Sequence, residues 1–291
     1  MDLNEIIGQL QEGDNRALAR ALTHVENRSE EARMLLSAIF ANQHTSMIVG
    51  LTGPPGVGKS TLGDVLASTA QQKGHNVAIL AIDPTSPLSG GAILGDRARM
   101  QASTVDSSIF VRSMATRGHV GGLSNAAFEA LAILESANKD FIILETVGAG
   151  QDEDEVAAAV EVTVVVLAPG LGDELQASKS GLMEIADILV VNKADRDGAD
   201  ILADELEAHS DGKPVLQTCG LTGKGVEFLF DEAFIRRRER HLMKAWLLNV
   251  FRERVQEEIS EELWEEILEK LRARTLTPYE AAEQLLLSLK S

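Results

Sequence analysis

The stretch Gly53-Pro54-Pro55-Gly56-Val57-Gly58-Lys59-Ser60-Thr61 decides the fold, because it matches the phosphate-binding pattern G-x-x-x-x-G-K-[S/T]. An apolar run, Met47–Leu51, precedes it and a helical stretch, Leu62–Ala70, follows it. This is the strand-loop-helix context that the pattern requires. The glycines let backbone N–H groups approach phosphate oxygens that a side chain would block. We therefore predict that this loop binds the phosphates of a nucleotide.

Two side chains of the loop have roles that follow from their position. Lys59 brings a positive charge to the β- and γ-phosphates and is a candidate catalytic residue. The Ser60 hydroxyl is a candidate ligand of Mg²⁺. An ordinary turn rich in glycine and proline is the structural alternative, but the complete pattern in its required context favours phosphate binding.

The middle of the chain alternates apolar runs with helical stretches. The runs are short and apolar without alternation, as expected of strands that are covered on both faces. They lie at Met47–Leu51, Val77–Ile82, Ile109–Val111, Phe141–Leu144, Val162–Leu167, Ile188–Val191 and Val215–Leu216. This order predicts an α/β fold, a P-loop NTPase domain with a mainly parallel central sheet.

The two ends of the chain read as helices. Residues 1–45 carry apolar side chains at helical spacing. Residues 231–291 contain apolar helical stripes and a capping box, Thr277-Pro278-Tyr279-Glu280, which opens a last helix. We therefore divide the chain into an N-terminal helical extension (1–45), a P-loop domain (46–230) and a C-terminal helical arm (231–291).

The chain of 291 residues carries 27 Lys and Arg against 45 Asp and Glu, a net charge of −18. Such acidity makes nonspecific binding of nucleic acid or of a membrane surface a poor expectation. Residues 46–230 hold −13 of this charge. A polyanionic nucleotide must therefore be held there by individual groups next to the phosphates, such as backbone N–H groups and Lys59, and not by the overall charge of the domain. The single cysteine, Cys219, excludes an internal disulfide. Because we find no apolar signal core and no run of about 18 apolar residues, we expect a soluble, cytoplasmic protein.

Three acidic residues could complete a Mg²⁺ site next to the phosphate loop. Asp83 and Glu145 each end a predicted strand, at the edge of an α/β sheet where ligands bind. Asp96 lies in the glycine-rich segment Gly90–Arg97. Each carboxylate could hold Mg²⁺ directly or through water, and Asp83 and Glu145 are also candidate catalytic residues. A solvated loop acid or a helix cap remains the alternative for each.

The segment Glu145-Thr146-Val147-Gly148 resembles the D-x-x-G segment of GTPases, with Glu in place of Asp. The N–H group of Gly148 is then a candidate sensor of the γ-phosphate, in a loop that orders with triphosphate and relaxes after hydrolysis. Ala149 stands where Ras-like enzymes have the glutamine that orients water, so we expect slow intrinsic hydrolysis. Gln151 and Asp83 are weaker substitutes for that glutamine.

A second motif indicates which base is bound. Asn192-Lys193-Ala194-Asp195 follows a predicted strand and matches the N-K-x-D motif of guanine-nucleotide proteins. The Asp195 carboxylate can accept hydrogen bonds from guanine N1–H and the 2-amino group, a pair that adenine does not offer. The Lys193 stem can cover the base, and Asn192 can join two loops. We predict a G domain that binds GTP and GDP.

A third segment, Cys219-Gly220-Leu221, follows the last predicted strand. It sits where GTPases contact the base through backbone N–H groups, so all three residues are candidate nucleotide contacts. Cys219 is expected to be a small structural residue and not a nucleophile, because no activating histidine lies beside it in the sequence.

Four segments, Asp83–Arg97, Glu145–Gln151, Gly172–Gln176 and Asn192–Asp195, together resemble the MeaB/ArgK family. These are GTPases associated with methylmalonyl-CoA mutase and related adenosylcobalamin-dependent acyl-CoA mutases. The resemblance implies a chaperone that gates cofactor loading, protects the mutase and helps to eject damaged cobalamin. It also implies a homodimer held by the C-terminal arm.

The resemblance also assigns roles to single residues. It places Lys59 and Ser60 on phosphate and Mg²⁺, and it makes Ala168–Lys179 a third switch loop that contacts the mutase. The acids that it implies for the metal shell or for catalysis are Asp83, Asp96 and Glu145.

Two departures from the family pattern lie in switch regions. Asp152 stands where the family usually has Ser, and Ser180 follows Lys179 where the family often has a second Lys. They leave open which mutase is the partner. Two other functions remain alternatives: a nickel or cobalt insertion GTPase, and a P-loop kinase. The former class carries His or Cys clusters, whereas this chain has one Cys and six His without paired spacing; a kinase does not need guanine selectivity.

Overall fold

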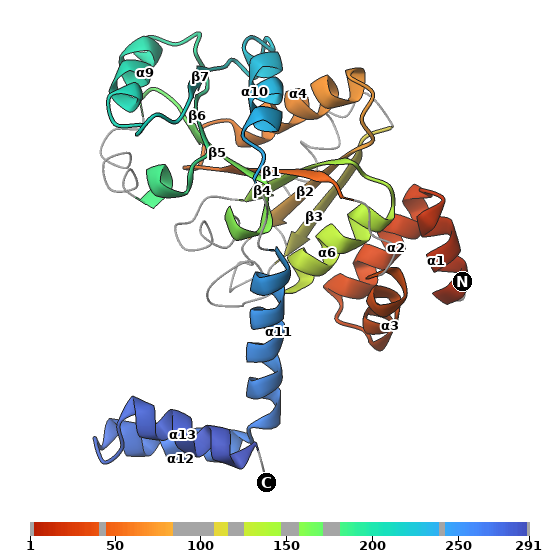
Figure 1. Cartoon of the computed structure of the whole chain (residues 1–291), viewed down its shortest axis with the longest axis vertical. Helices are drawn as coiled ribbons and strands as arrows, with labels where there is room; N and C mark the ends of the chain where they lie inside the picture. Colours follow the sequence, from red (N-terminus) through yellow and green to blue (C-terminus); the bar gives the residue numbers. More distant parts are fainter. Residues whose placement is uncertain are drawn as a thin grey trace. The chain divides into compact units, whose positions relative to one another are not determined.

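The structure is a computed structural model that describes residues 3–40, 45–83, 108–115, 125–146, 157–170, 181–238 and 242–289. Within these ranges, only the backbone is described for Asp83, Ala115, Asn125, residues 242–245 and Glu253. The chain forms two compact units, Met1–Leu242 and Met243–Ser291 (Figure 1). Among the described helices, none combines the length and the apolar character that crossing a membrane needs.

The described part of the first unit is built on one sheet of seven parallel strands. They are β1 (Met47–Thr52), β2 (Val77–Asp83), β3 (Phe110–Ala115), β4 (Phe141–Thr146), β5 (Val162–Leu167), β6 (Ile188–Val191) and β7 (Val215–Gln217). Their order is β3-β2-β4-β1-β5-β6-β7, with every neighbouring pair parallel. The predicted α/β fold is confirmed, although β3 extends to Ala115, beyond the apolar run that predicted it.

Burial on both faces explains the apolar composition of the strands. All residues of β1, β4 and β5 are buried. Val49 and Leu51 of β1 share a core with helices α4 (Lys59–Gln72) and α10 (Val226–Ile235). Towards the β7 edge of the sheet, a second core joins Val165 on β5 and Leu189 on β6 to α9 (Ala199–Glu207). Figure 1 shows α6 (Asn125–Ser136) on the other side of the sheet from α4 and α10.

Three helices precede the sheet: α1 (Leu3–Gln11), α2 (Asn15–Glu26) and α3 (Glu30–Ile39). Helices α2 and α3 pack against α6. The carboxylate of Asp14 caps α2 by accepting hydrogen bonds from the N–H groups of Arg16 and Ala17, at 2.8 and 2.7 Å. Arg112 on β3 pairs with Glu26 at 2.6 Å. The N-terminal helices therefore belong to the same compact unit as the sheet.

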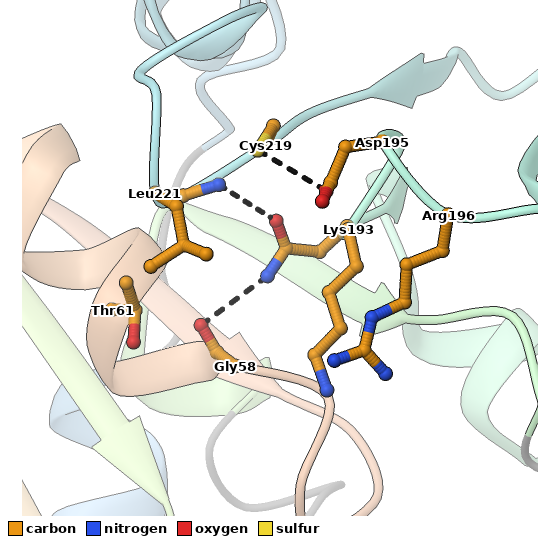
Figure 2. A pocket seen from close by; sticks show the side chains of 9 residues that line it. Gly58, Thr61, Lys193, Asp195, Arg196, Cys219 and Leu221 are labelled. Atoms are coloured by element: carbon orange, nitrogen blue, oxygen red, sulfur yellow. Dashed lines mark hydrogen bonds between the residues drawn. The ribbon is translucent and has the colours of Figure 1, made fainter.

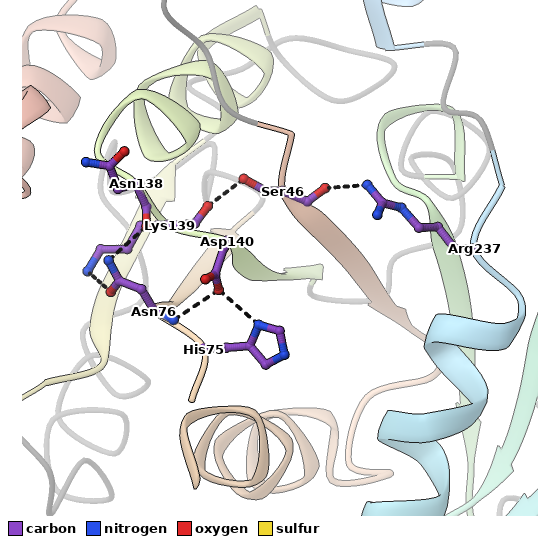
Figure 3. A network of polar contacts seen from close by, with 7 residues as sticks. All are labelled: Ser46, His75, Asn76, Asn138, Lys139, Asp140 and Arg237. Atoms are coloured by element: carbon purple, nitrogen blue, oxygen red, sulfur yellow. Dashed lines mark hydrogen bonds and ion pairs between the residues drawn. The ribbon is translucent and has the colours of Figure 1, made fainter. Parts of the chain in front are cut away.

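Polar groups join the N-terminal ends of β1, β2 and β4 (Figure 3). The Asp140 carboxylate accepts a hydrogen bond from Asn76 N at 3.0 Å, and the Ser46 hydroxyl donates to the carbonyl of Lys139. Arg237, which follows α10, donates to the carbonyl of Ser46 at 3.3 Å. Lys139 is buried, and its Nζ donates to Asn76 Oδ1 at 2.9 Å. Burial lowers the pKa of the Lys139 ammonium.

The second unit is helical in its described residues. It comprises most of α11 (Leu242–Glu258), then α12 (Glu261–Arg272) and α13 (Pro278–Ser288). The expected capping box opens α13, since Thr277 Oγ1 accepts from Glu280 N and the Glu280 carboxylate accepts from Thr277 N. The expected arm boundary at residue 231 falls inside α10, because Phe230 and Ala233 are part of the core of the first unit.

Candidate nucleotide-binding site

The phosphate loop lies between the central strand β1 and helix α4. Gly53 has a φ of +137°, and a Cβ there would lie 2.1 Å from the carbonyl oxygen of Val166 on β5. Gly58 has a φ of +93°, and its Cβ would lie 2.7 Å from Asn192 Nδ2. Because only glycine fits at both positions, the loop backbone can run close to the ends of β5 and β6.

Lys59 opens α4 and is 7% exposed. Its Nζ donates hydrogen bonds to the carbonyls of Gly53 and Pro54, at 2.7 and 3.0 Å. The loop therefore holds the ammonium at the N-terminus of α4, where the backbone N–H groups also favour an anion. This is the electrostatic environment that a phosphate group requires.

Ser60 and Glu145 meet beside this loop. The Ser60 hydroxyl donates to Glu145 Oε1 at 2.6 Å. Glu145 is 5% exposed and lies on β4, in register with Leu51 of β1 and Ala81 of β2. Asp83 ends β2, at the same edge of the sheet. Hydroxyl and carboxylate oxygens are hard donors, so this pair fits a Mg²⁺ ion.

The remaining predicted metal and switch residues lie outside the described part of the chain. This holds for Asp96, Gly148 and Gln151, for most of Ala168–Lys179, and for the side chain of Asp83. Among the described side chains, no group of three His, Cys, Asp or Glu could hold a metal ion. Among the predicted metal ligands, Ser60 and Glu145 are therefore the two whose side chains the structure describes.

Asn192 follows β6 and joins three loops through one buried amide. Its Nδ2 donates to the carbonyl of Val57 in the phosphate loop at 2.9 Å. Its Oδ1 accepts from Thr218 Oγ1 and from Gly220 N, both at 3.1 Å. The loop after β7 is thereby bound to the phosphate loop. The sequence does not predict this hydrogen bond from Thr218, because Thr218 precedes the Cys219–Leu221 segment and belongs to no motif.

Asp195 presents an exposed carboxylate to the pocket, and the Cys219 thiol donates a hydrogen bond to its Oδ1 at 3.2 Å. This bond, and then a backbone hydrogen bond of Asp195 itself, lowers the pKa of the carboxyl; the charges of Arg196 and Lys193 act in the same direction. A lowered pKa favours the ionised carboxylate, which is the form that the predicted contact with guanine needs. From the sequence we expect Cys219 to be a candidate nucleotide contact and a small structural residue, and the hydrogen bond from its thiol to Asp195 was not predicted.

A pocket lies between these loops (Figure 2). Lys193 has a φ of +58°, which is uncommon for a residue with a side chain, and its Nζ donates to the carbonyl of Gly56. Its stem thus runs from the base motif to the phosphate loop. The lining residues are Gly58, Thr61, Asn192, Lys193, Asp195, Arg196, Cys219, Gly220 and Leu221. Arg196 also lines the pocket, although it lies outside the N-K-x-D motif.

Comparison with known proteins places this site in a family. The family described as methylmalonyl-CoA mutase-associated GTPase MeaB matches residues 18–277. This chain belongs to the MeaB family. A relative from Pyrococcus horikoshii, one of several that are named as GTPases, is 42% identical over 98% of this chain and 97% of its own length. The Mus musculus protein named methylmalonic aciduria type A homolog, mitochondrial, is 32% identical over 97% of this chain and 78% of its own.

A solved structure agrees with this placement. The crystal structure of an LAO/AO transport system kinase matches with a TM-score of 0.70 and 26% identity, covering 99% of this chain and 98% of its own. As a MeaB-family protein with a P-loop fold, the chain is a GTPase and binds guanine nucleotides. The family is described as associated with methylmalonyl-CoA mutase.

Proposed function

We propose that this MeaB-family GTPase is a Mg²⁺-dependent chaperone of an adenosylcobalamin-dependent acyl-CoA mutase, either methylmalonyl-CoA mutase or a close relative, and that it gates cofactor loading and reactivation. The family description and the name of the mouse relative support this partner. The observation that carries the proposal is the contact between Ser60 and Glu145 at 2.6 Å. This contact connects the nucleotide site to β4, and the chain continues from β4 into the segment that begins at Val147. Hydrolysis of GTP to GDP can therefore affect that segment through Glu145.

The base and phosphate subsites have separate tasks in this proposal. Asn192, Lys193 and Asp195 select guanine, with the backbone of Cys219–Leu221 on the other side of the base. The backbone N–H groups of Gly53–Thr61, together with Lys59, hold the phosphates. They also stabilise the negative charge that develops as water attacks the γ-phosphate in line.

The proposed Mg²⁺ ion is held by Ser60 and Glu145, with Asp83 and Asp96 as further acids of its shell. When bound, Mg²⁺ neutralises charge on the β- and γ-phosphates. Removal of the ion with EDTA is expected to abolish GTP hydrolysis while GDP binding through the base motif persists in weakened form. Hydrolysis in EDTA at the rate seen with Mg²⁺ would contradict the metal assignment.

Hydrolysis by the protein alone is expected to be slow. Ala149 replaces the water-orienting glutamine, and Asp83, Glu145 and the N–H of Gly148 are the groups left to act near the γ-phosphate. We propose that the mutase supplies what is missing by contacting the switch segments. The protein would then report the state of the mutase and not hydrolyse GTP in bulk.

The test is to measure phosphate release from GTP with and without an adenosylcobalamin-dependent methylmalonyl-CoA mutase. We expect the mutase to accelerate hydrolysis by roughly 10-fold or more, as a coupling free energy of about 1–3 kcal/mol allows. Serum albumin at the same concentration is the control, and Ser60→Ala should remove hydrolysis under both conditions. Rapid hydrolysis by the protein alone, unchanged by the mutase, would overturn the proposal.

The same preparations separate two alternatives. The structural neighbour named as a kinase makes phosphoryl transfer to protein worth measuring with γ-labelled GTP. Label that appears on a co-purified protein would favour a kinase. Nickel or cobalt bound at purification and released on hydrolysis would favour a metal-insertion GTPase.

We further propose a homodimer that forms through the C-terminal helices. Several large apolar side chains of the arm are exposed in the single chain, which a second copy could cover: Leu247, Leu248 and Phe251 on α11, and Leu286 and Leu287 on α13. Light scattering after size exclusion is expected to give twice the mass of the chain. A monomeric mass at all concentrations would refute the dimer.

A further inference from the structure

Arg196, the residue after the base-reading Asp195, lines the nucleotide pocket and is exposed. Within the described ranges of the chain, its guanidinium forms no hydrogen bond and no ion pair. Other arginines of the first unit do: Arg112 pairs with Glu26, and Arg238 pairs with Asp187. A guanidinium that lines a pocket and has no hydrogen-bond or ion-pair partner among the described residues can bind a ligand.

Two anchors determine how a guanine nucleotide lies in this pocket. Asp195 accepts from the edge of the base, and the phosphate loop binds the other end of the molecule. The Lys193 side chain spans these anchors, because it leaves the turn after β6 and its Nζ donates to the carbonyl of Gly56. In Figure 2 the Arg196 side chain leaves the same turn and extends in the same direction as Lys193. Arg196 therefore borders the space between base and phosphates.

We propose that Arg196 is a further nucleotide-binding residue, whose planar guanidinium packs against the guanine ring beside the stem of Lys193. Guanidinium planes stack on aromatic and purine rings and also attract their π-electrons. Leu221 lines the opposite side of the pocket in Figure 2, and its side chain is 85% exposed, so it offers an apolar surface to the other face of the base. This inference rests on the guanine site proposed at Asn192–Asp195.

A long-range role of Arg196 would have different consequences. If the residue only attracted a polyanion to an acidic domain, its loss would slow association and salt would screen the effect. Stacking on the ring instead slows dissociation and depends on the planar shape of the guanidinium, which lysine lacks. The two roles can therefore be distinguished by the association and dissociation rates of the nucleotide, by their dependence on salt, and by the affinity of Arg196→Lys.

The experiment compares the full-length protein with Arg196→Ala, Arg196→Lys and the control Arg236→Ala. Arg236 is an exposed arginine of the same unit that pairs with Glu232 and does not line the pocket. We expect Arg196→Ala to weaken GDP binding, measured by calorimetry, by about 3- to 10-fold, chiefly through faster dissociation. Inosine diphosphate should lose the same factor, since it keeps the ring and lacks only the 2-amino group. Arg196→Lys should recover little, and Arg236→Ala should bind as the wild type does.

Steady-state hydrolysis provides a second readout. Arg196→Ala should raise the KM for GTP and leave kcat unchanged, because the contact is at the base and not at the γ-phosphate. The inference is overturned if Arg196→Ala binds GDP within twofold of wild type. It is also overturned if Arg196→Lys rescues fully and the loss lies only in a salt-sensitive association rate. If the wild-type protein binds ADP as tightly as GDP, the proposed guanine site itself is wrong. If the wild type clearly prefers GDP but Arg196→Ala binds GDP with unchanged affinity, only the role of Arg196 is refuted.

Discussion

The hydrogen bond from Cys219 to Asp195 makes one sulfur atom part of the base site. We expect Cys219→Ala to weaken GDP binding by about 2- to 5-fold, because the carboxylate loses a donor that orients it. Cys219→Ser should retain binding, since a hydroxyl can donate the same bond. Calorimetric titration with GDP measures both. Equal binding by all three proteins would show that the thiol only fills space.

Gly53 is the position in the loop where an added Cβ would come closest to another backbone atom. We expect Gly53→Ala to lower the free energy of unfolding by at least about 3 kcal/mol, because a strained φ adds to a collision with the carbonyl of Val166. Gly74→Ala is the matched control: Gly74 has a φ of +94° and open space around its Cβ, so only the cost of φ, about 1 kcal/mol, should appear. Urea unfolding gives both values. Similar losses would mean that the loop relaxes around the methyl group.

At the scale of elements, the strands are the part most directly readable from the sequence. The run Val162–Leu167 is apolar except for Thr163 and is buried at every position, and it coincides with the observed strand β5. Strand β3 is different, since Arg112 and Ser113 interrupt its apolar pattern. Arg112 is accommodated because α2 supplies Glu26, a contact between segments far apart in the chain.

Lys139, at the N-terminal edge of the sheet, gives a test of stability against pH. Its folded-state pKa lies below the ordinary value of 10.5, so the unfolded chain binds more protons in the interval between the two values. Stability contributed by this residue should therefore rise as pH increases through that interval. We expect Lys139→Met to be neutral to about 1 kcal/mol more stable at pH 7, since it removes a buried charge.

The advantage of Lys139→Met over wild type should shrink as the pH approaches 10. Urea unfolding of both proteins at several pH values measures this difference in the free energy of unfolding. Contributions from other titrating groups are the same in both proteins and cancel when the two values are subtracted. A constant difference across the range would show that the Lys139 ammonium is as well solvated in the folded protein as in the unfolded chain.

For the whole molecule, the division into two units separates nucleotide binding from the proposed dimer contacts. All pocket residues lie in Met1–Leu242, and the described core around the site is made by the same unit. A chain that ends at residue 242 is therefore expected to bind GDP within about twofold of the full-length protein, because no part of the site is lost. Light scattering should show it as a monomer. A truncated protein that remains dimeric would move the dimer contact into the first unit.

The sequence by itself determined the fold class and the GTPase family, and it predicts where the phosphate loop lies and which carboxylate selects guanine. Those features depend on local residue types: glycines where backbone meets phosphate, a lysine and a hydroxyl that follow, and a carboxylate that matches guanine. Only the tertiary structure decided which side chains support them. Asn192 reaches Val57, Thr218 and Gly220, Cys219 reaches Asp195, and Ser60 reaches Glu145, each across a long stretch of chain. Such contacts are set by the order of parallel strands, which brings distant loops to one edge of the sheet, and no local pattern in the sequence encodes that order.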